Sequence, residues 1–261
     1  FYGTDLVTIT LPNTVTSLGV SAFNGCSKLT SVTLGSGIRE LPMLVFAGCE
    51  SLTSFTVPAS LTTVSDTAFA YCDNLEFLYV DPDNESMHEK YGVIFDADWN
   101  IVIFPATKHD LTIPKDTKTI PEHFFEDYEI TSVTVEDGNT AFVAAANVLY
   151  NAAMDEILFI PDGLTSYEVP AAFLATPEKA GKLFEILAGV SSLTDITLAD
   201  GVTDYRVASG AVYTASWELV FFPKGRTEFV IPKEVTELKA VSSIGTYDLF
   251  ADSALKTVSY E

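Results

Sequence analysis

The sequence predicts a right-handed leucine-rich-repeat solenoid, mainly β or α/β, of about ten rungs, with three β-hairpin insertions and one short helix. The main observation is a six-residue opening, L-x-x-[apolar]-x-[apolar], that recurs every 23 residues. A period of 20 to 29 residues with this core is typical of a solenoid in which each repeat supplies one short strand and one return segment. The regular openings start at Leu6, Leu29, Leu52 and Leu75, and later ones start at Ile130, Leu193 and Leu255.

The regular repeats occupy residues 1–80. Phe23, Phe46 and Phe69 keep the same 23-residue interval, each six residues before the next opening. Large apolar residues stand six residues before the later openings too. We therefore interpret 1–261 as a single solenoid domain, with regular repeats over 1–80 and long repeats over 81–261. The predicted rung strands end at Leu11, Leu34, Val57, Val80, Ile113, Val135, Val169, Leu198, Ile231 and Tyr260.

The long repeats carry an insertion with one plan. In the first, the apolar runs 92–95 and 100–105 flank a polar turn, which predicts a β-hairpin. Nine residues after the proline that closes each hairpin, a second proline follows a short apolar run, as Pro12 and Pro58 do in the regular repeats. Each long repeat is thus predicted to hold a hairpin and an additional rung. The other hairpins are expected at 147–161 and 210–223.

One segment departs from this plan. Leu183, Phe184 and Leu187 follow Pro177 at helical spacing, and Thr176 stands where a helix cap is expected. Proline is favoured in the first turn of a helix because its missing N–H has no partner there anyway. We therefore predict a helix at about 177–188.

The amino-acid composition excludes some classes of function. The 261 residues include 14 Lys plus Arg and 36 Asp plus Glu, a net charge of −22, and 48% are hydrophobic. This charge disfavours a phosphate-binding surface, so no nucleic-acid partner is expected, while the apolar content predicts a folded core. No run approaches the roughly 18 to 20 apolar residues that cross a bilayer, so no membrane span is predicted. The start at Phe1, without an apolar leader, fits a mature or excised chain.

Cys26, Cys49 and Cys72 lie on the repeat interval, and Asp127, Val190 and Asp252 take their place later in the chain. A position that accepts these substitutes is interpreted as a packing site. No C-x-x-C motif or histidine pair completes a metal-ligand set, so no metal and no cofactor are predicted. A disulfide between adjacent rungs and a metal site stay open as alternatives.

Polar loops and histidines give no catalytic pattern. Asp96-Ala-Asp98-Trp-Asn100 alternates oxygen donors, but the glycine and glutamate of a calcium loop are missing. The segment 81–85 is interpreted first as an acidic loop, with calcium binding left open as the alternative. His88, His109 and His123 lie in different segments, and no nucleophile or phosphate-loop motif occurs. The protein is predicted not to be an enzyme. Whether Asn84-Glu-Ser86 is glycosylated stays open.

The outward face of the rung strands is the candidate binding surface. Strand alternation exposes positions 3 and 5 of each opening, which are mostly Ser and Thr, a pattern that also suits a purely structural sheet. Phe77 and Tyr79 interrupt it with an aromatic pair, and Asp195 and Thr197 make a polar pair. Exposed aromatic residues are typical interface anchors. Trp99 and Trp217 in the hairpins complete the candidate set; the alternative is that the first hairpin covers Phe77 and Tyr79.

The segment Leu6-Val-Thr-Ile-Thr-Leu-Pro12, with Ala22-Phe-Asn-Gly-Cys-Ser-Lys-Leu29, resembles the BspA-like leucine-rich repeat family, also called the Treponema pallidum type. The likeness is strong over 1–80 and continues through the hairpin inserts. It departs from the family pattern at 171–192 and 233–252. The resemblance implies a secreted or surface-attached protein, commonly bacterial, that adheres to other proteins or cells, and it brings no catalytic residues.

The leading hypothesis is a non-catalytic, adhesin-like module of a bacterium, extracellular or on the cell surface. Its expected partner is a host matrix, host cell or microbial surface protein. The alternatives are a spacer within a larger surface protein and a carbohydrate-binding module that uses Phe77, Tyr79, Trp99 or Trp217. The oligomeric state cannot be predicted.

Overall fold

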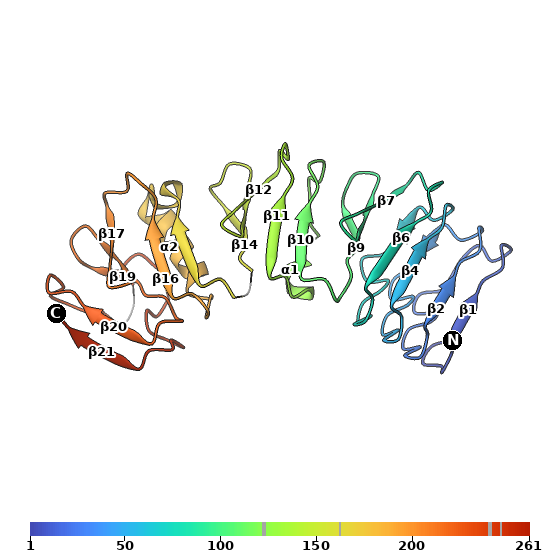
Figure 1. Ribbon diagram of the computed structural model, residues 1–261, viewed down its shortest axis with the longest axis horizontal. Coiled ribbons are helices and arrows are strands. Elements are labelled where there is room, and N and C mark those ends of the chain that lie inside the picture. Colours follow the sequence, from blue (N-terminus) through green and yellow to red (C-terminus); the bar gives the residue numbers. More distant parts are fainter. Residues whose placement is uncertain (122–123, 162, 240–241, 246) are drawn as a thin grey trace. The chain divides into compact units, whose positions relative to one another are not determined.

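The computed structural model describes residues 1–121, 124–161, 163–239, 242–245 and 247–261, and the fold is mainly β with few helices (Figure 1). The chain divides into two compact units, each with its own apolar core. Unit 1 contains Phe1–Ile130 and Val135–Ala141, and unit 2 contains Thr131–Thr134 and Phe142–Glu261. Within the described residues no helix is both long and apolar enough to cross a bilayer.

A strand lies at, or directly before, each of the ten rung ends predicted from the sequence. In unit 1, β1 pairs in parallel with β2, and β4 with β6; in unit 2, β15 pairs with β16 and β20 with β21. The bounds are β1 (Thr8–Thr10), β2 (Ser31–Thr33), β4 (Ser54–Val57), β6 (Phe77–Val80), β10 (Asp110–Ile113), β11 (Ser132–Val135), β15 (Ser166–Val169), β16 (Asp195–Leu198), β20 (Glu228–Ile231) and β21 (Thr257–Tyr260).

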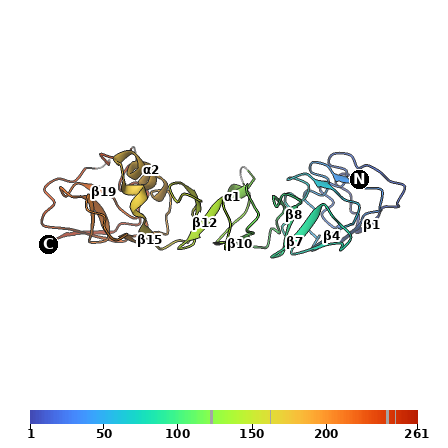
Figure 2. The ribbon, with the colours of Figure 1, turned by 90° about the horizontal axis from the view of Figure 1, so that it is seen from above.

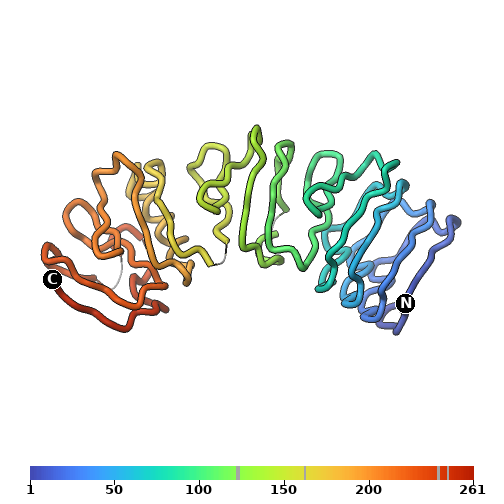
Figure 3. The backbone as a smooth tube through the Cα atoms, in the orientation of Figure 1, coloured from blue at the N-terminus to red at the C-terminus, as the bar shows by residue number. Residues whose placement is uncertain are grey.

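The regular repeats of unit 1 stack on one another, as the successive coils of the backbone show (Figure 3). The ring of Phe46 stacks on that of Phe23, with centroids 5.3 Å apart, and on that of Phe69, at 5.6 Å. Leu29 and Leu52, which open their repeats, are buried in the same cluster. The 23-residue interval therefore corresponds to ladders of identical side chains. Two short strands, β3 (Glu40–Leu41) and β5 (Thr63–Val64), also pair in parallel.

Each insertion is a three-stranded antiparallel sheet, one strand more than the predicted hairpin. The hairpin pairs β8–β9, β13–β14 and β18–β19 confirm the prediction, and the strands before them were missed. Tyr91 and Gly92, both with positive φ, form the two-residue turn that joins the missed first strand to the next. The bounds are β7 (Met87–Lys90), β8 (Val93–Asp96), β9 (Ile101–Ile103), β12 (Phe142–Ala145), β13 (Val148–Asn151), β14 (Ile157–Phe159), β17 (Tyr205–Ala208), β18 (Ala211–Thr214) and β19 (Leu219–Phe221).

The predicted helix is confirmed as α2 (Pro177–Leu187), which lies on the opposite side of unit 2 from β15 (Figure 2). The Thr176 hydroxyl accepts a hydrogen bond from the backbone N–H of Lys179, as expected of an N-cap. Phe184 on its buried face stacks on Phe221. The described residues also form a one-turn helix, α1 (Phe124–Asp127), and a 3₁₀ turn, η1 (Ala171–Leu174), so the expectation of a single helix was wrong.

Candidate functional site

The two aromatic side chains predicted on β6 do point outward. Phe77 is 50% exposed and Tyr79 is 55% exposed, whereas Leu78 between them is 5% exposed. The first hairpin therefore does not bury them, and the alternative that it covers both rings is wrong. Two large rings held side by side on a strand and left in solvent form a rigid apolar patch, which we call the β6 aromatic pair.

Short side chains border this pair on the neighbouring strand. In the parallel register of β4 and β6, Ser54 lies opposite Phe77 and Thr56 opposite Tyr79. β4 is followed by β2 and β1 across unit 1 (Figure 1), and those strands carry Ser or Thr at the same outward positions. The aromatic pair thus stands above a row of hydroxyls, where a partner can reach both rings.

Trp99 packs within the first three-stranded insertion, against side chains of β7. It occupies the turn between β8 and β9 with φ of 64°, and its ring stacks on that of His88 with centroids 5.0 Å apart. The ammonium of Lys90 lies 5.5 Å from the Trp99 centroid, a cation–π arrangement. These contacts give Trp99 a role in holding the first hairpin together.

Trp217 holds the equivalent position in unit 2, with φ of 67° in the turn between β18 and β19. The guanidinium carbon of Arg206 lies 4.7 Å from its ring centroid, and the Tyr213 ring packs beside it at 5.6 Å. Met154 in the second hairpin has the same backbone conformation. All three insertions therefore carry a bulky apolar residue on this turn. Trp217, like Trp99, is half-buried.

The predicted polar pair lies on β16 in unit 2, and both Asp195 and Thr197 are exposed there. On β15, Glu168 lies opposite Thr197. Nη1 of Arg226 lies 3.3 Å from Oδ1 of Asp195 and also donates to the Thr194 carbonyl at 2.9 Å. The Asp195 charge is thus partly satisfied within the chain.

The three cysteines form a ladder inside unit 1 and are free thiols. Each Sγ donates to the carbonyl of an aromatic residue one coil earlier: Cys49 to Phe23 at 3.4 Å, and Cys72 to Phe46 at 3.1 Å. Burial is the main cause that raises the pKa of Cys49 and of Cys72 to about 12. These contacts confirm the packing role predicted from the repeat.

The acidic turn at 96–100 is held by its own side chains, because the Asp96 carboxylate accepts the backbone N–H groups of Asp98 and Asn100 at 2.9 Å each. Asn84, in the possible glycosylation sequence, is 8% exposed. Its Nδ2 donates to the carbonyls of Pro58 and Leu61. Since a glycan is attached through Nδ2, the folded chain does not present this site.

Glu136 joins several segments of unit 1 through its carboxylate. The sequence did not reveal this role, because its partners are distant along the chain. Its carboxylate accepts hydrogen bonds from the Tyr91 hydroxyl and from the backbone N–H of Lys115, and it pairs with Lys90 at 2.6 Å. The hydrogen bonds from Lys90 and Tyr91 lower the pKa of Glu136 to about 2. This arrangement ties the turn between β7 and β8 to the rest of unit 1.

Unit 1 also contains a groove of about 510 Å³ that the sequence analysis missed. Carboxylates and aromatic rings line it, among them Asp66, Tyr71, Asp127 and Tyr128. One signal was present: Tyr71 occupies the position that Gly25 and Gly48 hold in the two preceding repeats. We call this cavity the acidic groove.

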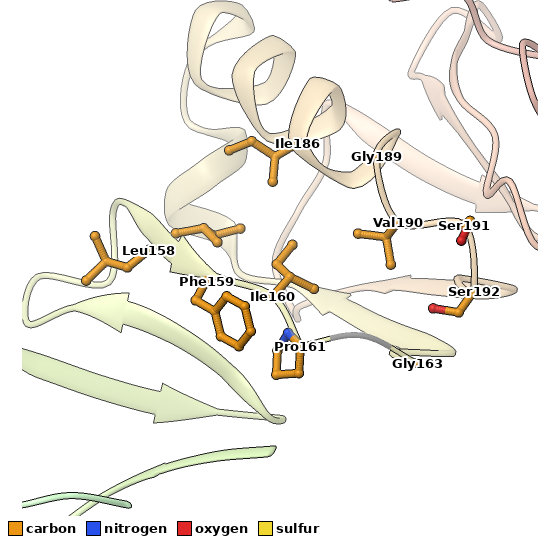
Figure 4. A pocket seen from close by; sticks show the side chains of 11 residues that line it. Leu158, Phe159, Ile160, Pro161, Gly163, Ile186, Gly189, Val190, Ser191 and Ser192 are labelled. Atoms are coloured by element: carbon orange, nitrogen blue, oxygen red, sulfur yellow. The ribbon is translucent and has the colours of Figure 1, made fainter. Parts of the chain in front are cut away.

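Unit 2 has an apolar pocket of about 650 Å³ between β14 and the end of α2 (Figure 4). Its walls come from aliphatic residues such as Leu158, Ile160, Ile186 and Val190, with Ser191 and Ser192 at one end. This pocket was not predicted either, because the hairpin and the helix that form it are far apart in the sequence.

Known proteins resemble this chain both in sequence, over its first third, and in fold, over nearly its whole length. A family model described as "BspA type Leucine rich repeat region" matches residues 1–91 in six copies. None of the curated proteins matches the chain. Among solved structures, the pneumococcal vaccine antigen PcpA has 16% identity and a TM-score of 0.51, with 98% of this chain and 68% of that chain covered.

Two further structures match with lower TM-scores. A leucine-rich repeat protein from Eubacterium ventriosum has 19% identity and a TM-score of 0.45, covering 98% of this chain and 66% of that one. A leucine rich cell surface protein from Faecalibacterium prausnitzii has 20% identity and a TM-score of 0.43, covering 98% and 60%. The match to PcpA shows a shared fold. Residues 1–91 match the BspA type leucine-rich repeat region, so the resemblance seen in the sequence is confirmed over that segment.

Proposed function

We propose that this chain is a non-catalytic protein-binding module of a bacterial cell surface, and that unit 1 binds its partner through the β6 aromatic pair. The family match over 1–91 supports this proposal, because the resemblance to BspA-like repeats implies a secreted or surface-attached protein. The pneumococcal antigen shares the fold, and fold alone does not assign a partner. The evidence for binding therefore comes from the exposed residues of β6.

The observation that carries the proposal is the half-exposed state of Phe77 and Tyr79 on a regular strand. Fully burying a side chain of this size is worth about 1.5–3 kcal/mol, so a partner that covers both rings gains a substantial share of its binding free energy there. Ser54 and Thr56 beside them offer hydroxyls that can pair with polar groups at the rim.

The charge of the chain indicates the kind of partner. A net charge of −22 attracts a cationic protein surface and accelerates its association, and salt weakens this attraction. Binding is therefore expected to be faster at low ionic strength. The residual affinity at high salt is expected to come from the two rings.

The continuous solenoid predicted from the sequence is also part of this proposal. We infer that the rungs of both units form one right-handed solenoid of about ten rungs over residues 1–261, as the recurring strands support. A crystal structure of the full chain tests this inference, and a left-handed coil or a break in the rung sequence would overturn it.

The binding proposal is tested with purified protein on immobilised matrix proteins, epithelial cells and bacterial surfaces. We expect saturable binding at moderate salt that falls about tenfold or more when Phe77→Ser and Tyr79→Ser are combined. The control combines Val20→Ser with Met43→Ser, two exposed apolar residues of unit 1 away from β6, and should leave binding unchanged.

Three outcomes contradict the proposal. Absence of saturable binding to every protein surface would leave the spacer role, and binding confined to a glycan array would favour carbohydrate recognition. Equal loss in the β6 variant and in the control variant would show that the aromatic pair is not the binding site.

A further inference from the structure

The acidic groove of unit 1 lies where the regular repeats give way to the first insertion. One wall is the return segment of the third repeat, from Asp66 to Asp73, and the other is the segment from Asp127 to Glu129. Phe104 and His109, which lie at and after the end of the first hairpin, also line the groove. The hairpin takes the place of a return segment at this point in the chain, and the groove of about 510 Å³ lies beside it.

Aromatic rings form much of the surface of the groove. The Tyr128 ring packs edge-on against that of buried Phe104, with centroids 4.9 Å apart. Tyr71 stands at the opposite wall and is 77% exposed. Both tyrosines line the groove, and the negative face of an aromatic ring attracts a cation.

Carboxylates supply the charge. Asp66, Asp73, Asp127 and Glu129 all line the groove and are exposed. No lysine or arginine is among the lining residues, and within the described part of the chain no cationic side chain pairs with these four acids. The negative charge of the groove is therefore available to a ligand from outside the chain.

From this geometry we infer that the acidic groove receives a lysine or arginine side chain of the partner protein. The inference rests on the proposed function, because it names the chemistry of the partner at a second contact of the same module. An aliphatic stem lies along the rings, and the charged head meets the carboxylates. The volume of the groove accommodates one such side chain with its neighbouring backbone.

Other occupants fit less well. A metal ion requires ligands that converge, and no three His, Cys, Asp or Glu side chains of the described residues gather in that way. An anionic ligand would be repelled by four carboxylates. A purely apolar ligand would leave these carboxylates desolvated without compensation.

The test uses three probes in a heteronuclear NMR titration of the full chain. They are Ac-Gly-Lys-Gly-NH₂, Ac-Gly-Arg-Gly-NH₂ and the lysine peptide acetylated at Nε, which keeps the shape and removes the charge. We expect saturable shifts at 66–73 and 127–129 with the charged peptides, and about tenfold weaker binding of the acetylated one.

Matched variants locate the effect. Asp66→Asn with Asp127→Asn removes two charges from the groove and keeps its shape, and binding of the lysine peptide should fall about tenfold. Glu50→Gln with Glu76→Gln removes two charges from exposed positions of unit 1 outside the groove, and should change binding less than about twofold. Tyr71→Gly restores the residue type of the preceding repeats while removing one ring, and should weaken binding about threefold.

Three results overturn the inference: no saturable shift with either charged peptide, equal binding of the acetylated peptide, or equal loss in the two double variants. Each differs from failure of the proposed function, which is measured on whole protein surfaces. If the β6 variant loses binding to protein surfaces and the charged peptides do not bind the groove, the proposed function is supported and only the groove inference is wrong.

Discussion

The thiol of Cys72 donates a hydrogen bond to the backbone carbonyl of Phe46 across 3.1 Å, and so joins two consecutive coils of unit 1. The Cys49 thiol makes the same contact with Phe23. The residue that closes one repeat therefore satisfies a buried carbonyl of the repeat before it. The Phe46 carbonyl also accepts the backbone N–H of Cys49 at 3.2 Å, so the thiol is its second donor.

Replacement of Cys72 tests this contact. Cys72→Ala should lower the free energy of unfolding by about 1–2 kcal/mol, because the Phe46 carbonyl loses one of its two donors and a small cavity remains. Cys72→Ser, which keeps a donor, should lose less. Urea unfolding followed by circular dichroism measures both variants, and an unchanged midpoint for Cys72→Ala would show that the contact is dispensable.

The thiols should also respond to alkali. The pKa of Cys49 rises from 9.0 to about 12 on folding, chiefly because the thiol is buried. The unfolded chain then loses its thiol protons at lower pH than the folded chain, so stability should fall as pH rises from 9 towards 12. At pH 8 a chromogenic disulfide reagent should label the cysteines only in denaturant. Rapid labelling of the folded chain would contradict this account.

Glu136 should make unit 1 sensitive to acid. Its pKa is lowered from 4.5 to about 2, so its contribution to stability is present above pH 4.5 and is lost as pH falls towards 2. Glu136→Gln should therefore reduce stability at pH 6 more than at pH 3. Urea midpoints of both proteins at the two pH values measure this, and a constant difference would show that the charge of Glu136 is not involved.

Asn84 should be structurally sensitive and unmodified. Asn84→Ala removes two donated hydrogen bonds, to Pro58 and Leu61, and two accepted ones, so it should cost about 2–4 kcal/mol. Asn74→Ala is the control, because exposed Asn74 makes one such bond, to Glu50, and should cost less than about 1 kcal/mol. A glycan found at Asn84 by mass spectrometry of the folded, secreted chain would contradict the buried geometry.

Tyr71 and Gly48 should respond to substitution with opposite signs. Tyr71 has φ of 59°, a left-handed conformation that glycine adopts without strain, so Tyr71→Gly should raise stability by up to about 1 kcal/mol. Gly48, one repeat earlier with φ of 66°, should lose about 1 kcal/mol on Gly48→Ala. Thermal unfolding measures both, and a destabilised Tyr71→Gly would mean that the ring contributes packing in place.

Much of the fold could be predicted because the repeat interval shows which residues occupy equivalent positions in successive coils. Leu29 and Leu52 recur at one interval, and burial of these residues in a shared cluster follows from it. The helix at Pro177 could be predicted from local signals alone. The first strand of each insert could not, because β7 reads Met-His-Glu-Lys and lacks the apolar run that marks its partners.

The candidate site divides in the same way. Exposure of Phe77 and Tyr79 follows from strand alternation, a local rule. The position of Trp99 against His88 depends on pairing between strands, and Glu136 lies 46 residues after its partner Lys90 in the sequence. Contacts of this kind carry no pattern along the chain.

The acidic groove is an intermediate case. Its walls come from segments separated by a hairpin, so the cavity could not be derived from one repeat. The replacement of the repeat's glycine by Tyr71 was visible in the sequence, and Tyr71 lines the groove.

Photo-crosslinking from β6 tests the central claim most directly. With p-benzoylphenylalanine in place of Tyr79, the bound partner should crosslink on irradiation, and the same probe in place of Thr56 on the adjacent strand should also capture it. A probe that replaces Val20 should capture none. Crosslinks from position 20 and none from 79 or 56 would contradict binding through the β6 aromatic pair.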